Sequence, residues 1–312
     1  MKIIRHLNNF STEKNSIITI GAFDGVHLGH HAVILKLKEI AKRKNLVPYV
    51  MFFEPLPKEY FQKEKAPDRV SSLRDKIITL REYGIENIIC IRFNEKFTNI
   101  EATDFIEKYL VGALKAKHII IGDDFKFGKA RKGDFDLLQK YSKNHDFAVD
   151  KLSTLNIENH RISSSLVRKA YKEHDLPKVR QLTNRRIVVT GRVIHGLKNG
   201  RKIGFNTANL KLPKNSVLKG VYLTKVTIDD KNYYGITNAG TRPTVCGKHN
   251  LLETHIFDFN QDIYQKHICI EILEFIRPEK KFGSFDELKN QISKDVITAK
   301  KIVSVGTVKL TN

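Results

Sequence analysis

Cysteine is scarce in this sequence, and the cysteines that occur are not arranged in pairs. The 312 residues contain three of them, Cys90, Cys246 and Cys269, which lie far apart and form no CxxC motif. Such spacing suggests neither a disulfide framework nor a zinc knuckle. Cys90 and Cys269 lie in apolar, strand-like runs, and we expect both to be small core residues.

Long apolar runs are also missing. No run approaches the roughly 20 residues that a membrane-spanning helix needs. The first 16 residues lack the apolar stretch and the small-residue cleavage site of a secretory signal. We therefore expect a cytoplasmic protein with no membrane partner. The shares of hydrophobic residues, 41%, and charged residues, 29%, are those of a globular protein, and the length favours about two domains.

Acidic residues are outnumbered by basic ones. The chain has 55 Lys and Arg against 34 Asp and Glu, a formal net charge of +21. This excess favours anionic partners such as nucleotides, nucleic acid or an acidic membrane surface. The basic residues are spread along the chain, so a lysine-rich surface without a specific partner is the alternative. Binding of single-stranded nucleic acid favours exposed aromatic residues among Lys and Arg. Phe and Tyr lie mostly within predicted strands, so we expect no nucleic-acid partner.

The first half of the chain alternates between two periodicities. Short apolar segments typical of strands are followed by segments with apolar residues at helical spacing. This alternation predicts βαβ units and a parallel sheet covered by helices on both faces. The expected strands are 16–21, 46–53, 87–93, 116–122 and 147–152, and the expected helices are 29–44, 71–84, 102–114, 134–145, 163–172 and 175–183.

After about residue 185 strand-like segments follow one another without helices between them. They are 186–195, 220–229, 232–240, 251–259 and 266–276, and a helix is expected at about 284–301. This pattern predicts a mostly antiparallel β-barrel or sandwich. We therefore predict an α/β doubly wound, Rossmann-like domain over 1–185, followed by a mostly antiparallel β-barrel with a C-terminal helix over 186–312. The pattern gives no prediction for 302–312.

The segment GAFDGVHLGH, residues 21–30, lies between the first expected strand of the alternating half and its helix. Ligands of doubly wound sheets bind beyond the C-terminal strand ends, and a helix N-terminus suits phosphate. His27 and His30 are three residues apart and can face the same side. The alternatives are a glycine turn with surface histidines and a zinc site, for which a third ligand is missing because His31 faces elsewhere. The spacing is neither GxGxxG nor a P-loop.

Three segments of the first half match a known family. GAFDGVHLGH resembles the HxGH signature of the nucleotidylyltransferases. Together with GDDFKFGKARKG (122–133) and RISSSLVR (161–168), it resembles the N-terminal module of the bacterial bifunctional riboflavin kinase/FAD synthetases. The resemblance implies adenylyl transfer from ATP to FMN, with His27 and His30 as catalytic residues. It implies ATP-binding roles for Gly21, Phe23, Asp24, Gly29, Asp124, Ser163, Ser164, Ser165 and Arg168. An ordinary helix cap is the alternative for the serines.

Four segments of the second half resemble the riboflavin kinase module of the same family, in order. They are GRVIHGLKNGRKIGFNTANL (191–210), NAGTRPT (238–244), LETHIFDF (252–259) and RPEKKFGSFDELKNQI (277–292). The glycine-rich, basic loop suits ATP phosphates, and the resemblance implies ATP-binding roles for Gly196, Gly200, Arg201 and Gly204. Riboflavin, ATP, FMN and FAD are the substrates and products that the two modules imply.

Three residues of the second half are candidates for the kinase chemistry. Thr207 and Asn209 are two apart, so they face the same side of an extended segment, and their oxygens suit a Mg²⁺ ion shared with ATP phosphates. Glu253 is placed to accept the proton of a ribityl hydroxyl. The alternative for Glu253 is a solvent-facing residue of an alternating strand.

One position departs from the family pattern. Asn206 stands where proline commonly precedes TAN. Proline fixes φ and removes a donor, so asparagine loosens the segment that carries Thr207. We expect a kinase that is intact or somewhat weakened. An FAD synthetase with an inactive kinase half is the alternative.

Overall fold

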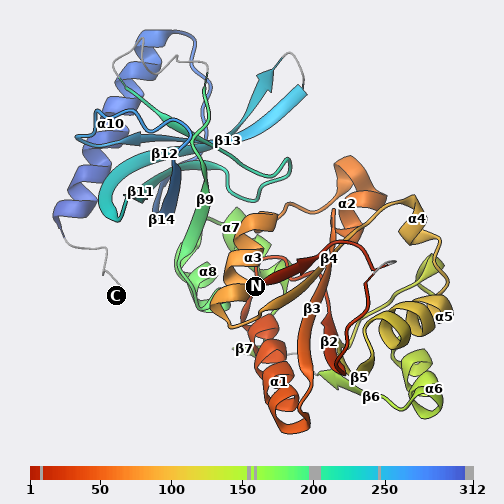
Figure 1. Ribbon diagram of the computed structural model, residues 1–312. Helices are drawn as coiled ribbons and strands as arrows, with labels where there is room; N and C mark the ends of the chain where they lie inside the picture. Colours follow the sequence, from red (N-terminus) through yellow and green to blue (C-terminus); the bar gives the residue numbers. More distant parts are fainter. Residues whose placement is uncertain (8–9, 153–155, 158–159, 197–204, 245–246, 306–312) are drawn as a thin grey trace. The chain divides into compact units, whose positions relative to one another are not determined.

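The structure is a computed structural model that describes residues 1–312 except 8–9, 153–155, 158–159, 197–204, 245–246 and 306–312 (Figure 1). The chain divides into two compact units. The first comprises Met1–Pro67 and Lys76–Leu166, and the second comprises Asp68–Asp75 and Val167–Asn312. Apart from residues 68–75, the boundary between the two units follows residue 166. The division of the two activities at residue 185 stays a prediction.

The first unit is built on a parallel sheet with the strand order β1-β4-β3-β2-β5-β6. Its strands are β1 (Lys2–Ile4), β2 (Ser16–Ile20), β3 (Val47–Glu54), β4 (Asn87–Arg92), β5 (Ala116–Gly122) and β6 (Ala148–Leu152). The helical segments between them are α1 (Leu28–Lys44), α2 (Pro57–Gln62), η1 (Lys63–Lys65), α3 (Leu73–Glu82), α4 (Glu95–Thr98), α5 (Ala102–Asp104), the π-helix η2 (Phe105–Ala113), η3 (Lys129–Arg131) and α6 (Phe135–His145). A short hairpin of β7 (Asn156–Ile157) and β8 (His160–Arg161) follows.

Helices cover both faces of this sheet because the strands are apolar on both faces. All five residues of β2 are buried, as expected of a strand inside a doubly wound sheet. Ile18 and Ile20 of β2 belong to a core cluster with Phe105 and Leu110 of η2. Alternate residues of a strand face opposite sides, so Ile17 faces away from η2. Helix α1 contacts β2 and β3 and buries its own apolar residues.

The second unit contains an antiparallel sheet with the strand order β10-β13-β12-β11-β14-β9. Its strands are β9 (Ile187–Arg192), β10 (Ala208–Lys211), β11 (Gly220–Ile228), β12 (Lys231–Thr244), β13 (Gly247–Ile256) and β14 (His267–Arg277). A bridge between Ile194 and Asn209 joins the two edges, so the sheet closes into a barrel. Its helices are α7 (Ser164–Lys172), which starts in the first unit, α8 (Leu176–Thr183) and α10 (Phe285–Ser304).

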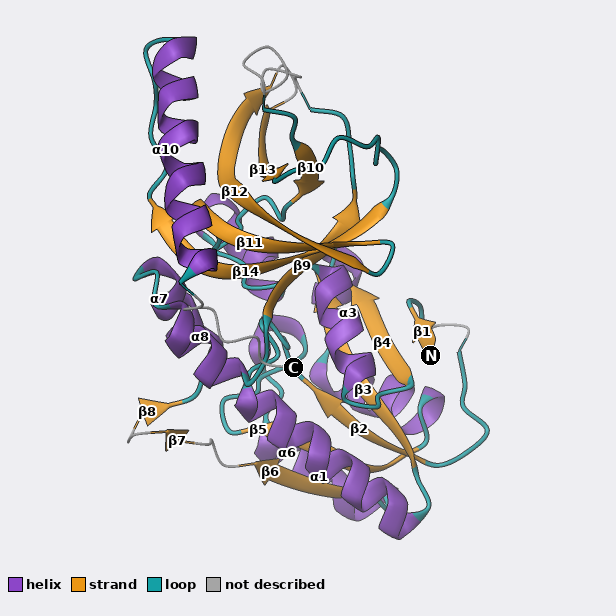
Figure 2. Ribbon diagram, turned by 90° about the vertical axis from the view of Figure 1, so that its left-hand side faces the viewer, coloured by secondary structure: helices purple, strands orange, loops and turns teal. Residues whose placement is uncertain are grey.

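Helix α10 lies against the outside of the barrel (Figure 2). Leu223 and Leu273 of the barrel pack with Ala299 of α10. The barrel interior contains a chain of hydroxyl groups: Thr237 Oγ1 lies 2.8 Å from Thr224 Oγ1 and 2.9 Å from Thr254 Oγ1. Residues of β13 alternate between these environments, because Thr254 is fully buried while the neighbouring residues at 253 and 255 are half-buried.

The predicted fold class is confirmed, with local differences. The sequence pattern did not predict β1, β10, α2 or α4, which are three to six residues long. The expected helix 102–114 is one turn of α-helix followed by π-helix. Cys90 is buried in β4 as expected, and Cys269 is half-buried. Cys246 lies outside the described residues.

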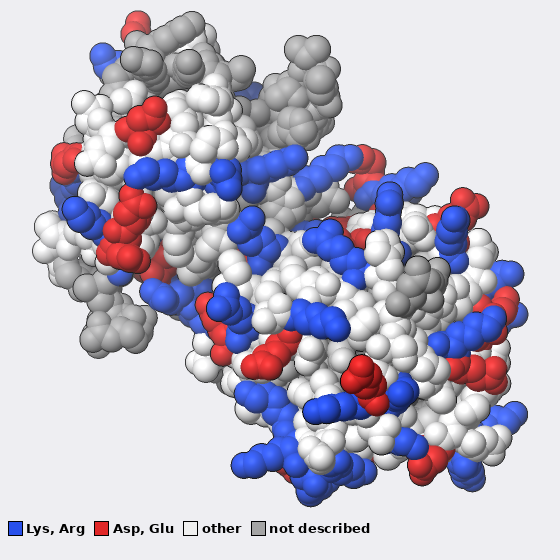
Figure 3. Space-filling model, viewed as in Figure 1, with Lys and Arg blue, Asp and Glu red and all other residues white. Residues whose placement is uncertain are grey.

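Basic side chains are scattered among acidic ones over the face drawn in Figure 3. Within the described parts of the chain, no helix is both long and apolar enough to cross a membrane.

Candidate active sites

The first candidate site lies at the C-terminal ends of β2 and β5, which are neighbours in the sheet. The strand order reverses beside β2, since the chain runs from β2 to β3 on one side and later reaches β5 on the other. Such a switch point is where open α/β sheets bind ligands. The loop after β2 carries GAFDGVH, and the loop after β5 carries the GDDF motif. The structure therefore brings two of the three predicted motifs of this half to one edge.

The loop between β2 and α1 has an unusual backbone. Gly25 has φ of 81°, and two larger residues also have positive φ, Phe23 at 49° and Val26 at 36°. Positive φ is uncommon for residues with a side chain, and it persists only where the surroundings impose it. Both side chains are buried, which supplies that constraint. A Cβ on Gly21 would lie 3.2 Å from the Phe23 ring, so a glycine suits this close approach.

His27 and His30 lie together at the start of α1. Their ring centroids are 3.8 Å apart and the rings are stacked. His30 also packs on Phe23, with 4.8 Å between ring centroids. A Cβ on Gly29 would lie 3.1 Å from the His27 ring, so glycine leaves room for the histidine. His31 stacks instead on Tyr83, which agrees with the expectation that it faces elsewhere.

The third motif, 161–168, adjoins the same loop. Ser164 Oγ donates to the carbonyl oxygen of Asp24 at 2.8 Å. Ser163 Oγ accepts from the backbone N–H of Leu166 at 3.2 Å, so this serine forms the helix cap that was the alternative interpretation. Ser165 is exposed. The serine motif and the glycine-histidine loop, about 140 residues apart in sequence, are therefore in direct contact.

Two predicted ligands have other partners. The side chain of Asp124 is 82% exposed and lies 3.8 Å from Arg161, which pairs more closely with Asp123 at 2.8 Å. Arg168 belongs to the second compact unit, where its Nε donates to the carbonyl of Asp68 at 2.6 Å. Roles for Asp124 and Arg168 in binding ATP stay predictions.

Lys76 is a residue that the sequence interpretation missed. Its side chain is fully buried. The Nζ donates to the carbonyl of Ala22 at 2.8 Å and lies 4.7 Å from the centroid of the Phe52 ring. It thus fixes the main chain of the candidate ATP loop. The available signal was a lysine on the same helical face as Thr79 and Leu80, both buried.

The second candidate site begins with a pocket of about 290 Å³ at the barrel. Thr207 and Asn209 both line it, as expected for residues two apart in an extended segment. Asn209 is 3% exposed, and among the described residues no hydrogen-bond donor reaches its Oδ1. A Cβ on Gly196 would lie 2.6 Å from Asn209 Nδ2, so glycine lets the main chain run close to the Asn209 side chain. Gly200, Arg201 and Gly204 lie outside the described residues.

Glu253 lines a second pocket, of about 210 Å³, between the barrel and α10. Thr207 lines this pocket as well. Glu253 lies opposite Asn209 in the pairing of β13 with β10. The structure thus brings the predicted base and the predicted metal ligands together, and it does not leave Glu253 on a solvent-facing strand.

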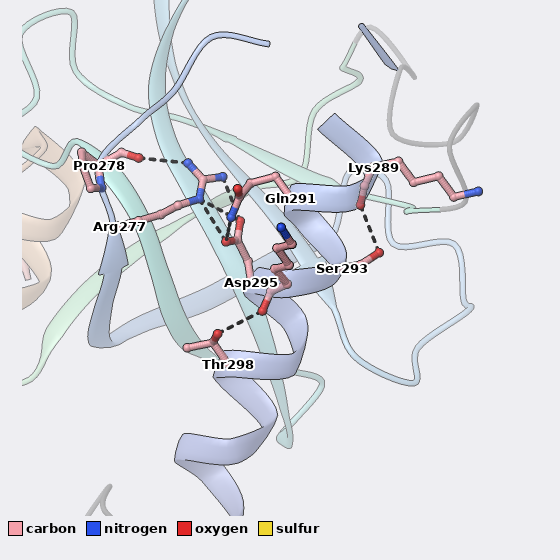
Figure 4. A network of polar contacts seen from close by, with 8 residues as sticks. Arg277, Pro278, Lys289, Gln291, Ser293, Asp295 and Thr298 are labelled. Carbon is pink, nitrogen blue, oxygen red and sulfur yellow. Dashed lines mark hydrogen bonds and ion pairs between the residues drawn. The ribbon is translucent and has the colours of Figure 1, made fainter. Parts of the chain in front are cut away.

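The wall of the Glu253 pocket is fixed by a partly buried ion pair (Figure 4). Arg277, at the end of β14, binds Asp295 of α10 through Nε and through Nη2, the latter at 2.8 Å. Gln291 Nε2 donates to the same carboxylate at 2.9 Å. Asp295 is 3% exposed. A bidentate, charge-assisted contact of this kind holds a fixed geometry, so the end of β14 is tied to the helix that covers the pocket.

Comparison with known proteins agrees with this geometry. The family model described as FAD synthetase matches residues 9–166, and the model described as riboflavin kinase matches residues 183–303. A solved chain from Streptococcus pneumoniae, described as a macrolide-efflux protein, superposes with a TM-score of 0.76. It is 28% identical and covers 96% of this chain and 98% of its own.

Curated relatives resemble the chain over nearly its whole length. The bifunctional riboflavin kinase/FMN adenylyltransferase of Escherichia coli K12 is 42% identical over 305 residues, which are 96% of this chain and 97% of the relative. The protein of the same description from Haemophilus influenzae is 44% identical over 303 residues, 96% of this chain and 98% of the relative. This chain therefore belongs to the family of bifunctional riboflavin kinase/FMN adenylyltransferases.

Proposed function

We infer that this protein carries out two successive reactions of flavin cofactor synthesis. It phosphorylates riboflavin with ATP to give FMN, and it transfers the adenylyl group of a second ATP to FMN, which gives FAD and pyrophosphate. The observation that carries this inference is the match of both family models in their order along one chain, together with relatives of the same bifunctional description over 96% of it.

The adenylyl transfer is assigned to the site at β2 and β5. An oxygen of the FMN phosphate attacks the α-phosphorus of ATP, and the bond to pyrophosphate breaks. No covalent enzyme intermediate is needed, so positioning and charge stabilisation suffice. His27 and His30, stacked at the start of α1, are proposed to donate hydrogen bonds to the ATP phosphates. The contact between Ser164 and Asp24 holds the serine motif against the same loop.

The kinase reaction is assigned to the two pockets that share Thr207. Riboflavin is placed in the Glu253 pocket and ATP in the Asn209 pocket. The Glu253 carboxylate accepts the proton of the terminal ribityl hydroxyl as that oxygen bonds to the γ-phosphorus, and ADP leaves. Because Glu253 and Asn209 are paired across neighbouring strands, the base and the phosphate-binding side are close enough for direct transfer.

Mg²⁺ is the proposed cofactor of the kinase site. The buried Oδ1 of Asn209 has no hydrogen-bond donor among the described residues, and a buried oxygen of this kind is costly unless a ligand satisfies it. Thr207, which lines the same pocket, adds a hydroxyl oxygen. Both are hard oxygen ligands of the kind that Mg²⁺ takes beside phosphates. When bound, the ion would neutralise charge on the phosphates.

The test is incubation of the purified protein with riboflavin, ATP and Mg²⁺, followed by chromatographic separation of the flavins. FMN should appear first and FAD after it. With added FMN instead of riboflavin, FAD should form without delay. FAD from FMN but no FMN from riboflavin would reduce the function to that of an FAD synthetase. Formation of neither flavin would refute the inference.

A further inference from the structure

A short segment separates the two pockets of the barrel. Phe205 lines the Glu253 pocket, Asn206 lines the Asn209 pocket, and Thr207 lines both. None of the three belongs to a strand, since β10 begins at Ala208. Asn209 Nδ2 donates to the carbonyl of Thr207 at 3.3 Å. A segment with no sheet pairing of its own needs further contacts to stay in place, because a flexible backbone loses conformational entropy when it is fixed.

His255 supplies such a contact. Its Nδ1 lies 3.0 Å from the carbonyl oxygen of Asn206. A carbonyl oxygen only accepts, so Nδ1 must carry the proton. The Phe205 ring makes a T-shaped contact with the same imidazole, with 4.9 Å between centroids and 86° between the ring planes. His255 follows Glu253 by two residues on β13, so both side chains project from the same face of the strand.

The surroundings of the His255 imidazole favour its neutral form. Burial lowers its pKa below the ordinary value; the contact with the Asn206 carbonyl and Asp258 oppose this shift, and Lys300 adds to it. A neutral histidine has one N–H. That N–H is committed to the carbonyl of Asn206, which fixes both the tautomer and the orientation of the ring.

We propose that His255 is a positioning residue of the kinase reaction, which fixes the main chain at Asn206 and thereby Thr207 between the nucleotide and the flavin pockets. This role rests on the proposed kinase function. The contact uses the backbone carbonyl, which proline presents equally, so the anchor does not depend on the side chain at 206.

Two variants separate the hydrogen bond from the packing of the ring. His255→Phe keeps a ring against Phe205 but removes the donor. His255→Asn removes the ring but places an amide N–H near the position of Nδ1. His267→Phe is the control, because His267 is an exposed histidine of the same barrel. For each protein, initial rates of FMN formation are measured against Mg²⁺ and ATP concentration, and FAD formation from added FMN reports on the other site.

His255→Phe should raise the Mg²⁺ and ATP concentrations for half-maximal rate about tenfold, equivalent to about 1.4 kcal/mol, with a smaller change in kcat. His255→Asn should recover values within about threefold of wild type. FAD formation from FMN should be unchanged in both. A wild-type Mg²⁺ dependence in His255→Phe would overturn the proposal, and so would equal impairment of the two variants, which would assign the effect to ring packing.

A second measurement decides the matter if His255→Phe does not fold. The imidazole ¹⁵N signals of wild-type protein, with those of His255 identified by their loss in His255→Asn, report the tautomer. The Nδ1–H form supports the proposal and the Nε2–H form overturns it. If the wild-type protein forms no FMN at all, it is the proposed kinase function that fails, whereas an active wild type with an unaffected His255→Phe refutes only the role of His255.

Discussion

At the scale of single residues, the histidine pair at the start of α1 is central to the proposed adenylyl transfer. The rings stack at 3.8 Å, and Gly29 leaves the space that the His27 ring occupies. We propose that the two imidazoles bind phosphate at the N-terminus of α1, where the first backbone N–H groups of a helix have no intrahelical partners. That place can meet several phosphate oxygens at once.

The double variant His27→Ala/His30→Ala should abolish FAD formation and leave FMN formation largely intact. Loss of one group that stabilises developing charge typically costs about 10²–10³ in rate, and this variant removes two. His31→Ala is the matched control, since His31 lies on the same helix but stacks on Tyr83. Rates of FAD formation from FMN are compared for the three proteins. FAD synthesis within a few fold of wild type in the double variant would show that the pair has no catalytic role.

Glu253 is tested by the change that removes only its basicity. Glu253→Gln keeps the size of the side chain, so FMN formation should fall by roughly 10²–10⁴, the usual contribution of general-base catalysis. FAD formation from added FMN should stay near normal. Glu271→Gln is a suitable control, because Glu271 lies on β14 of the same barrel and pairs with Arg186 at 3.5 Å. A kinase rate unchanged by Glu253→Gln would exclude this residue as the base.

At the scale of elements, the segment before β10 is the part of the site where the sequence suggested a departure from the family pattern. Asn206 is exposed, and its carbonyl accepts from His255. Within the described parts of the chain, its N–H makes no hydrogen bond that proline would break. Asparagine in place of proline at 206 therefore affects the stiffness of the segment and not the hydrogen bond from His255 to the carbonyl of residue 206.

Asn206→Pro should lower the apparent KM for ATP in the kinase reaction only, because a stiffer segment holds Thr207 and Asn209 with less loss of entropy on binding. If the native φ suits proline, thermal unfolding should show a gain of about 0.4–1 kcal/mol. Asn232→Pro in β12 offers a contrast, since the β11–β12 pairing there makes proline destabilising. An unchanged KM for ATP would show that Asn206 does not loosen the site.

Elements and contacts differ in how well the sequence predicted them. The buried strand β2 and the helix α1 were predictable because their apolar residues repeat over enough positions. Strands β1 and β10, with three and four residues, are too short to show a period. The contact of Ser164 with Asp24 could be expected only from the family resemblance, because no local sequence pattern encodes a contact across 140 residues. The contact of His255 with a main-chain carbonyl leaves no trace in the sequence at position 206.

At the scale of the whole molecule, the two compact units do not follow a single cut of the chain. Residues 68–75 belong with the second unit, where Asp75 Oδ1 accepts from the backbone N–H and the hydroxyl of Thr190, at 3.1 and 2.8 Å. Helix α8 belongs there as well, because Arg180 donates to the carbonyls of Ile272 and Leu273. The ring of His174 stacks on Phe275 at 3.6 Å.

Two fragments test this division. The fragment 186–312 should phosphorylate riboflavin without making FAD. The fragment 167–312 should do the same and unfold at a temperature a few degrees higher, because it keeps the contacts of Arg180 and His174, and hydrogen bonds of charged groups contribute about 1.5–3 kcal/mol each. Flavin chromatography and thermal unfolding are the measurements. FAD formation by either fragment would contradict the assignment of adenylyl transfer to the first unit.

The central claim, two reactions on one chain, is tested most directly by following the phosphates of ATP. The full-length protein is incubated with riboflavin, Mg²⁺ and ATP labelled at either the γ- or the α-phosphate, and the flavins are separated over time. The γ-label should enter FMN first and FAD afterwards, and the α-label should enter FAD alone, because the first reaction transfers the γ-phosphoryl group and the second transfers AMP. Absence of the γ-label from FMN, or of the α-label from FAD, would contradict the account.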